Sequence, residues 1–288
     1  MNTVPKSGVP YGAQAPKIRR RRMNVSLLLG GATIIFWLIV ALVGPMVAPH
    51  APGQVVDLDV FSPASSALPL GSDYLGRDVL SRMLIASRFT VSIALLATLL
   101  AATTGVFCGL LAASSGWIDT ILSKLFDTLS AVPSLMFGLV VIGSLGASIP
   151  VLVGTLATVY SPGAFRTSRA LARNIAVLDF VTVARARGET LPYIVLREIL
   201  PNLVGPLAAD FGLRFVFVTL LLSGLSFLGL GVQPPNADLG ALVRENIAGL
   251  GFGAAAVLVP TFAIASLTIG MNMVIDAVSG GRRAGGRR

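Results

Sequence analysis

The stretch DFVTVARARGETLPYIVLREILPN, residues 179–202, is polar and rich in arginine, and long apolar segments flank it on both sides. Charged side chains are costly inside a bilayer, so this stretch is expected to lie outside the membrane but close to its surface. Good helix formers precede Gly188, a residue suited to ending a helix. Thr190 is suited to capping a second helical piece, and Pro192 is tolerated in its first turn. The pattern predicts a short helix, a glycine elbow and a second helix that enters the membrane near Pro201.

The composition of the chain is that of a polytopic membrane protein. Hydrophobic residues make up 54% of it and charged residues only 12%, and its mean hydropathy is +0.82. Soluble domains carry about 25% charged residues, so an all-α fold with about six membrane-spanning helices is predicted. The predicted spans are residues 25–47, 89–114, 128–146, 149–168, 203–231 and 253–275. They form one transmembrane domain, 25–279, between basic tails at 1–24 and 280–288.

The positive charge is concentrated in the two tails. The formal net charge is +9, and ten Lys and Arg residues lie in the tails without an acidic residue beside them, so the rest carries 9 − 10 = −1. A nucleic-acid-binding surface is therefore not predicted. Of the 22 Lys and Arg, four lie in outer connections and Arg214 lies in a span, which leaves 22 − 4 − 1 = 17 on the side of the tails. The positive-inside rule favours cytoplasmic N- and C-termini and a cytoplasmic 179–202 stretch.

The connection after the first span is polar and contains prolines and Gly/Ser clusters. Apolar residues recur at helical spacing over 73–88, which predicts an amphipathic helix at the outer interface. Asp78 and Arg82 are four residues apart and are predicted to form an ion pair within that helix. In the fourth span, Pro162 is expected to bend the helix.

The chain contains no recognisable site for catalysis or for ATP. A phosphate-binding loop needs Gly-x4-Gly-Lys-Ser/Thr, but the only lysines, Lys6, Lys17 and Lys124, follow Pro, Pro and Ser. The single histidine, His50, lies in a proline-rich outer loop, and the single cysteine, Cys108, lacks partners for a disulfide or a metal site. The chain is therefore predicted not to be an enzyme, and an energy source for transport must come from another chain.

The 179–202 stretch resembles the cytoplasmic coupling loop of binding-protein-dependent ABC importer permeases. That loop carries Glu-Ala-Ala, three residues, Gly, and a spacer ending in Ile-Leu-Pro. Here Thr182-Val183-Ala184 occupies the Glu-Ala-Ala place, Gly188 follows, and Ile199-Leu200-Pro201 closes the pattern, with no carboxylate at Thr182. Three further segments resemble the dipeptide, oligopeptide and nickel branch of these permeases in the same order: 70–88, 116–135 and 225–240. The resemblance covers about residues 25–279.

The resemblance implies a permease subunit of type I ABC importer fold in a bacterial inner membrane, forming half of a translocation pathway. A second, homologous permease chain would complete a heterodimer. Two separate ATPase subunits would bind ATP and Mg²⁺, so no cofactor is expected in this chain, and an extracytoplasmic binding protein would deliver the solute. Dipeptides, longer peptides, nickel chelates and opine-like compounds are all candidate solutes.

The resemblance also implies which residues contact an ATPase. They are Thr182, Val183, Ala184, Arg185, Ala186, Arg187, Gly188 and Pro201. For Arg185 and Arg187 an equally good interpretation is retention on the inner side with contact to lipid headgroups. Outside the membrane, residues 233–236 and the 73–88 segment either contact the delivery protein or only order the outer loops.

Asp210 and Arg214 lie four residues apart within the fifth predicted span, about 13 and 20 Å along it at 1.5 Å per residue. Charges at such depth face a bundle interior or a watery cavity. The pair is predicted either to satisfy itself as a structural ion pair, which is favoured, or to offer Arg214 to a solute carboxylate. Permeases of this family often carry a glutamate before the SFLGLG stretch, where this chain has Leu222.

A self-sufficient secondary carrier or channel that uses Asp210 and Arg214 is the alternative from a different class. Such a carrier predicts an inverted internal repeat, and the two halves of this sequence show none that is convincing. It would also have no use for a coupling helix. The importer subunit is therefore the favoured interpretation.

Overall fold

A computed structural model of the chain describes residues 25–252 and 254–283. The predicted tail 1–24 lies outside the described residues, as does the end of the predicted tail 280–288. The described part consists of helices and turns, and its only β-pairs are two isolated bridges within residues 55–78. The predicted all-α fold is confirmed.

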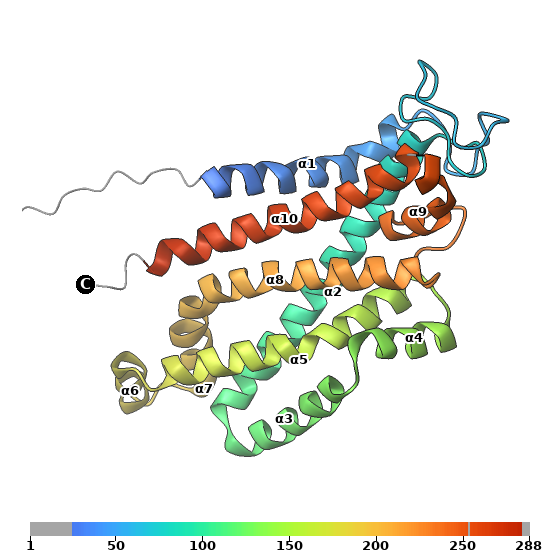
Figure 1. Cartoon of the computed structure of the whole chain (residues 1–288). Coiled ribbons are helices and arrows are strands. Elements are labelled where there is room, and N and C mark those ends of the chain that lie inside the picture. Colours follow the sequence, from blue (N-terminus) through green and yellow to red (C-terminus); the bar gives the residue numbers. More distant parts are fainter. Residues whose placement is uncertain (1–24, 253, 284–288) are drawn as a thin grey trace, which may run out of the picture.

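The helices form one bundle whose long members run roughly side by side (Figure 1). In chain order they are α1 (Val25–Val47), α2 (Val79–Ser114), α3 (Gly116–Ala131), α4 (Ser134–Leu145), α5 (Ile149–Ala176), α6 (Asp179–Ala186), α7 (Leu191–Tyr193), a π-helical turn (Ile194–Ile199), α8 (Leu200–Phe227), α9 (Leu239–Glu245), a 3₁₀ turn (Ile247–Phe252) and α10 (Ala255–Arg283).

Four helical segments of the described chain are long and apolar enough to cross a membrane: α1, α2, α7 to α8 as one run of 37 residues, and α10. The bent pair α3 and α4 makes a fifth if the two count as one broken span. The predicted span 149–168 lies in α5, which is not among these helices; Arg166, Arg169 and Arg173 occupy its second half. The multi-pass character of the chain is clear from these helices.

The helix predicted over 73–88 is confirmed from Val79 onward, but its predicted beginning is wrong. The helix begins only at Val79, because the Asp78 carboxylate accepts hydrogen bonds from the backbone N–H groups of Leu80 and Ser81 and so caps it. From there α2 runs without a break into the second span, through Ser114. The predicted pair of Asp78 with Arg82 is also wrong, because Asp78 is used as the cap.

The third predicted span, 128–146, is not one helix. α3 ends at Ala131 and α4 begins at Ser134, and the two axes differ by 84°. The cause is Pro133, which has no N–H for the helix ladder and restricts Val132 to the extended backbone observed there. In α5, by contrast, the helix continues through Pro162. The carbonyl of Thr158, which Pro162 leaves without an N–H partner, accepts the Ser161 hydroxyl at 3.0 Å.

The tightest helix pair is α2 with α5, and two glycines four apart on α2 allow it. A Cβ on Gly105 would lie 2.3 Å from the Cβ of Ala164, and one on Gly109 would lie 2.0 Å from the Ser168 Oγ. This is the small-residue packing by which helices approach closely in membranes. The Ser168 hydroxyl also donates to the carbonyl of Gly105 at 3.0 Å across the contact.

Replacing Gly105 by alanine is expected to lower the stability of the folded protein by about 1–3 kcal/mol, because the added methyl group forces α2 and α5 apart. The melting temperature of the purified protein in detergent measures this. Gly154→Ala on α5 is the matched control, because a Cβ there meets nothing within 4 Å. Equal melting temperatures for the two variants would contradict the packing argument.

The two ends of the bundle differ. The start of α1, the end of α10 and the α6–α7 region all lie at one end, at the left of Figure 1. The loop between α1 and α2, together with α9, lies at the other end. The 179–202 stretch is therefore on the same side as the beginning of the first helix and the end of the last, as the positive-inside argument requires.

Candidate functional site

The 179–202 stretch forms the predicted short helix and glycine elbow. α6 ends in two hydrogen bonds, from the Gly188 N–H to the Arg185 carbonyl and from the Glu189 N–H to the Ala184 carbonyl. This pattern is the Schellman helix end, which needs a left-handed residue after the helix. Gly188 supplies it with a φ of +79°. Thr190 stands at the cap position of the second piece, but its side chain makes no capping hydrogen bond.

The second helical piece, which follows the elbow, is not separate from α8. α7 passes through the π-helical turn into α8, so that residues 191–227 are one continuous helical run. Pro201 follows the π-helical turn inside this run, so its missing N–H leaves a carbonyl of the preceding turn without its usual backbone partner. π-helical turns often mark functional positions. The helical run that follows the elbow therefore has no break before α8.

One apolar cluster ties this region to the bundle. On α6 the buried side chains are Val181 and Ala184, both fully enclosed. They pack with Ala172 of α5, Ile194 of the π-helical turn and Leu203 of α8. Because close-packed interiors have low compressibility, this cluster fixes the position of α6 against α5 and α8.

The opposite face of α6 is open. Phe180 and Val183 are exposed, at 40% and 55%, although both are apolar. Arg185, Ala186 and Arg187 are exposed beside them. Most of the predicted contact residues thus lie together on an exposed apolar and cationic surface of α6 and its end. Ala184 does not, because it is fully enclosed in the bundle, and Pro201 stands apart at the start of α8.

Asp119, Arg169 and Arg173 form a charged group near this end of the bundle, and the sequence did not predict that they interact. Asp119, in the first turn of α3, accepts hydrogen bonds from Arg169 through Nε and Nη2, and from Arg173 Nη2 at 2.6 Å. Both arginines belong to α5. This clamp fixes the start of α3 against the helix that leads into α6. The sequence shows the charges but not their pairing, since 50 residues separate Asp119 from Arg169.

Asp210 and Arg214 form an ion pair along α8. The guanidinium donates to both carboxylate oxygens, at 2.6 Å from Nε and 2.8 Å from Nη2. Thr167 donates to Asp210 at 3.1 Å, and Arg214 Nη1 donates to the Tyr160 carbonyl at 3.1 Å. Arg214 is only 8% exposed. The pair satisfies itself and also joins α8 to α5.

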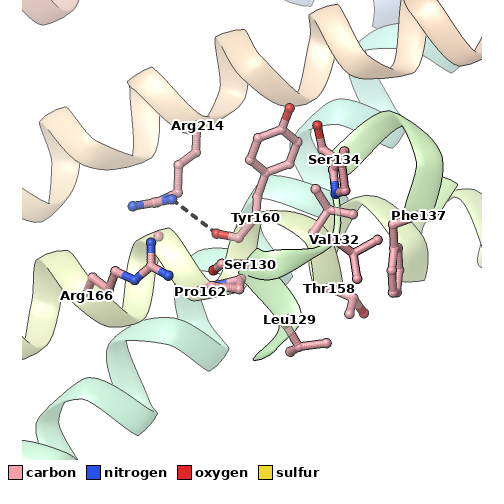
Figure 2. Close-up of a pocket in the computed structure, with 13 residues that line it drawn as sticks. Leu129, Ser130, Val132, Ser134, Phe137, Thr158, Tyr160, Pro162, Arg166 and Arg214 are labelled. Atoms are coloured by element: carbon pink, nitrogen blue, oxygen red, sulfur yellow. Dashed lines mark hydrogen bonds between the residues drawn. The ribbon is translucent and has the colours of Figure 1, made fainter. Parts of the chain in front are cut away.

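Arg214 also lines a cavity of about 330 Å³. Figure 2 shows the cavity, with Arg214 and Arg166 on one side and Ser134, Val132 and Phe137, from the α3–α4 break, on the other. It is the break at Pro133 that opens this space. Volumes of roughly 300–1,000 Å³ are typical of small-molecule sites.

At the other end of the bundle, four charged side chains form a buried cluster. Arg77 and Arg82 both contact Asp73 and Glu245, at 2.7 to 3.1 Å. Each side chain is 8% exposed or less. The cluster ties the α1–α2 loop and the start of α2 to α9. Among the described residues, no group of three or more His, Cys, Asp or Glu is placed to hold a metal ion.

The segment 233–236 is ordered by local contacts, since the Gln233 amide donates to the carbonyls of Gly229 and Gly231. Contact of this segment with a delivery protein stays a prediction.

Comparison with known proteins gives consistent matches. Residues 105–283 match the family described as binding-protein-dependent transport system inner membrane component. The dipeptide transport system permease protein of Haemophilus influenzae is 32% identical over 270 residues, covering 89% of this chain and 90% of that protein. The di/tripeptide transport system permease protein of Pseudomonas aeruginosa is 32% identical and covers 75% of this chain and 74% of its own length.

A third relative is the glutathione transport system permease protein of Pectobacterium atrosepticum, 28% identical over 86% of this chain and 83% of that protein. The family match runs from the last third of α2 to the end of α10 and includes the 179–202 stretch. This chain therefore belongs to the binding-protein-dependent transport system inner membrane components, as a permease subunit of an ABC importer.

Proposed function

We propose that this subunit forms half of the pathway for a peptide or a related small solute, with a homologous permease chain as the other half. Two separate ATPase subunits bind ATP and Mg²⁺ and dock on α6, and an extracytoplasmic binding protein delivers the solute. Both termini and α6 face the cytoplasm. The relatives named for dipeptide, di/tripeptide and glutathione transport support this class of solute.

The observation that carries the proposal is the two-sided character of α6. Its inner face, Val181 and Ala184, is enclosed in the bundle, whereas its outer face presents Phe180 and Val183 to solvent beside two arginines. Exposed apolar side chains rimmed by charge are typical of a protein-binding surface. A helix whose inner face packs in the bundle and whose outer face is apolar is suited to binding in a cleft on a partner protein.

The coupling follows from how α6 is attached. When two ATPases close around ATP, they displace the helix seated in their cleft. The Schellman end at Gly188 keeps the angle between α6 and the following helical run, and the cluster around Val181 moves with it. The run 191–227 then carries the displacement into the membrane. The Asp119 clamp makes α3 follow α5 in the same movement.

A cysteine at Ala186, with Cys108 replaced by alanine, tests this docking. Ala186 is exposed on α6. In membranes that also contain the ATPase subunits from the same transcription unit, the cysteine is expected to cross-link to an ATPase, and the yield is expected to change when ATP is added. The measurement is the adduct on a denaturing gel.

A cysteine at Thr103, exposed on α2, is the control and is expected to give no ATPase adduct. Absence of an adduct at Ala186, together with solute uptake that needs no ATPase, would instead favour a self-sufficient carrier.

A further inference from the structure

The cavity at the α3–α4 break has a charge pattern that its role in packing does not explain. Its lining includes two arginines, Arg166 and Arg214, but no carboxylate. The acidic partners of both arginines, Asp127 and Asp210, lie outside the lining. Each arginine is ion-paired with its carboxylate behind the lining, so the space is faced by guanidinium groups and by no acidic group. A cleft whose charged lining groups are all of one sign raises the local concentration of counter-ions.

Arg214 is oriented so that one hydrogen-bond donor, Nη1, faces the cavity. Nε and Nη2 bind Asp210, which holds the guanidinium plane, while Nη1 reaches over α5 to the Tyr160 carbonyl (Figure 2). Nη1 carries two protons, and the carbonyl accepts one. A preoriented guanidinium is well suited to a carboxylate, since little side-chain freedom is lost on binding.

Gly163 makes this orientation possible. A Cβ at that position would lie 2.4 Å from Arg214 Nη1, closer than any side chain allows. The rest of the lining suits a small polar molecule with an apolar part: hydroxyl groups of Ser130, Ser134 and Thr158, and the ring of Phe137.

We propose that this cavity is a solute site within the permease, in which Arg214 binds the carboxylate of the transported molecule. The site rests on the proposed import function and gives it a solute class: small molecules with a free carboxylate, such as dipeptides. Asp210 is then a positioning residue that presets the guanidinium.

The test uses Ser130→Cys in the Cys108→Ala background, in the complex of this chain with its permease and ATPase partners, without ATP or binding protein. An anionic and a cationic methanethiosulfonate reagent of similar size are compared, each normalised to its rate with a free thiol. The anionic reagent is expected to react about tenfold faster, the lower end of what a focused field gives.

Gly163→Ala is the decisive variant, because it displaces the flexible end of Arg214 without removing a charge. It is expected to reduce the anionic preference at least about threefold. Gly154→Ala, a glycine on the same helix with open space around it, is expected to leave the preference unchanged. Equal rates for the two reagents, or a preference that Gly163→Ala leaves intact, would overturn the proposal.

Protection identifies the ligand chemistry. Millimolar L-alanyl-L-alanine is expected to slow labelling of the cysteine, and L-alanyl-L-alaninamide, which lacks the carboxylate, is expected not to. Equal protection by both, or protection only by vesicles that contain phosphatidylglycerol, would also overturn the proposal, the second by showing a lipid-phosphate site. Labelling of the cysteine needs no ATPase activity. A negative labelling result would therefore contradict the solute site alone, whereas a negative Ala186 cross-link would contradict the docking of an ATPase.

Discussion

Replacing Arg82 by methionine is expected to cost about 3–5 kcal/mol of folding stability, because it breaks a buried ion cluster and leaves an uncompensated carboxylate. Arg82 Nη1 lies 2.8 Å from both Asp73 Oδ2 and Glu245 Oε2. The four charges of the cluster balance as they stand. Without Arg82, a single arginine faces two carboxylates that are both shielded from water.

Arg77 is not able to compensate. Burial lowers the pKa of its guanidinium, but Asp73 and Glu245 raise it by more, so the net direction is upward and the side chain stays charged. It already donates to both carboxylates, at 2.7 and 3.1 Å. Loss of Arg82 therefore loosens the attachment of the α1–α2 loop to α9 as well as lowering global stability.

Thermal unfolding of the purified protein measures the effect, and the rate of proteolysis within the 48–78 loop measures the local loosening. Arg88→Met is the matched control: the same substitution at an exposed position of the same helix, expected to change stability by no more than about 0.5 kcal/mol. Adding Glu245→Gln to Arg82→Met is expected to recover part of the loss. Equal effects at the two arginines would show that the cluster does not hold the loop.

Replacing Asp210 by leucine is expected to have the second large effect, again about 3–5 kcal/mol, because it leaves the Arg214 guanidinium without a carboxylate inside the bundle. Thr167 and the Tyr160 carbonyl remain as partners of Arg214, but neither carries a charge. The double variant Asp210→Leu, Arg214→Met removes both charges and is expected to regain most of the stability.

A double-mutant cycle on melting temperature and on unfolding free energy measures this coupling. If the stability losses of the two single variants simply add in the double variant, the coupling energy of the ion pair is zero. The double variant also separates structure from function: it is expected to fold and yet to lose the preference for the anionic reagent at Ser130→Cys. A merely structural pair would leave that preference unchanged.

Short-range signals in the sequence determined the local structure of the 179–202 stretch. The helix formers before Gly188, the glycine itself and Pro192 act on neighbouring backbone, so helix, elbow and second helix were predictable in order. The same kind of signal was present where the predictions were wrong. Asp78 is a good helix cap and Pro133 a good helix breaker, and in the structure each outweighs the hydrophobic periodicity around it.

Hydropathy and charge bias also determined the all-α membrane fold, because the energy of burying a helix in lipid depends on its own composition. Ion pairs between residues far apart in the chain, by contrast, do not follow from the composition of any one helix. Asp73 meets Glu245 through the arginines only because α2 and α9 are neighbours, and Asp119 meets Arg169 only because α3 folds back on α5.

The cavity depends on tertiary structure in the same way. The sequence placed Asp210 and Arg214 on one face of a helix, but whether the pair was structural or faced a solute depended on what lay opposite. The packing of α5 against α8 puts Gly163 beneath the guanidinium, and the break at Pro133 opens the space in front of it. Local preferences of the backbone settle helices and their ends, whereas a charged site between helices exists only once packing has brought its residues together.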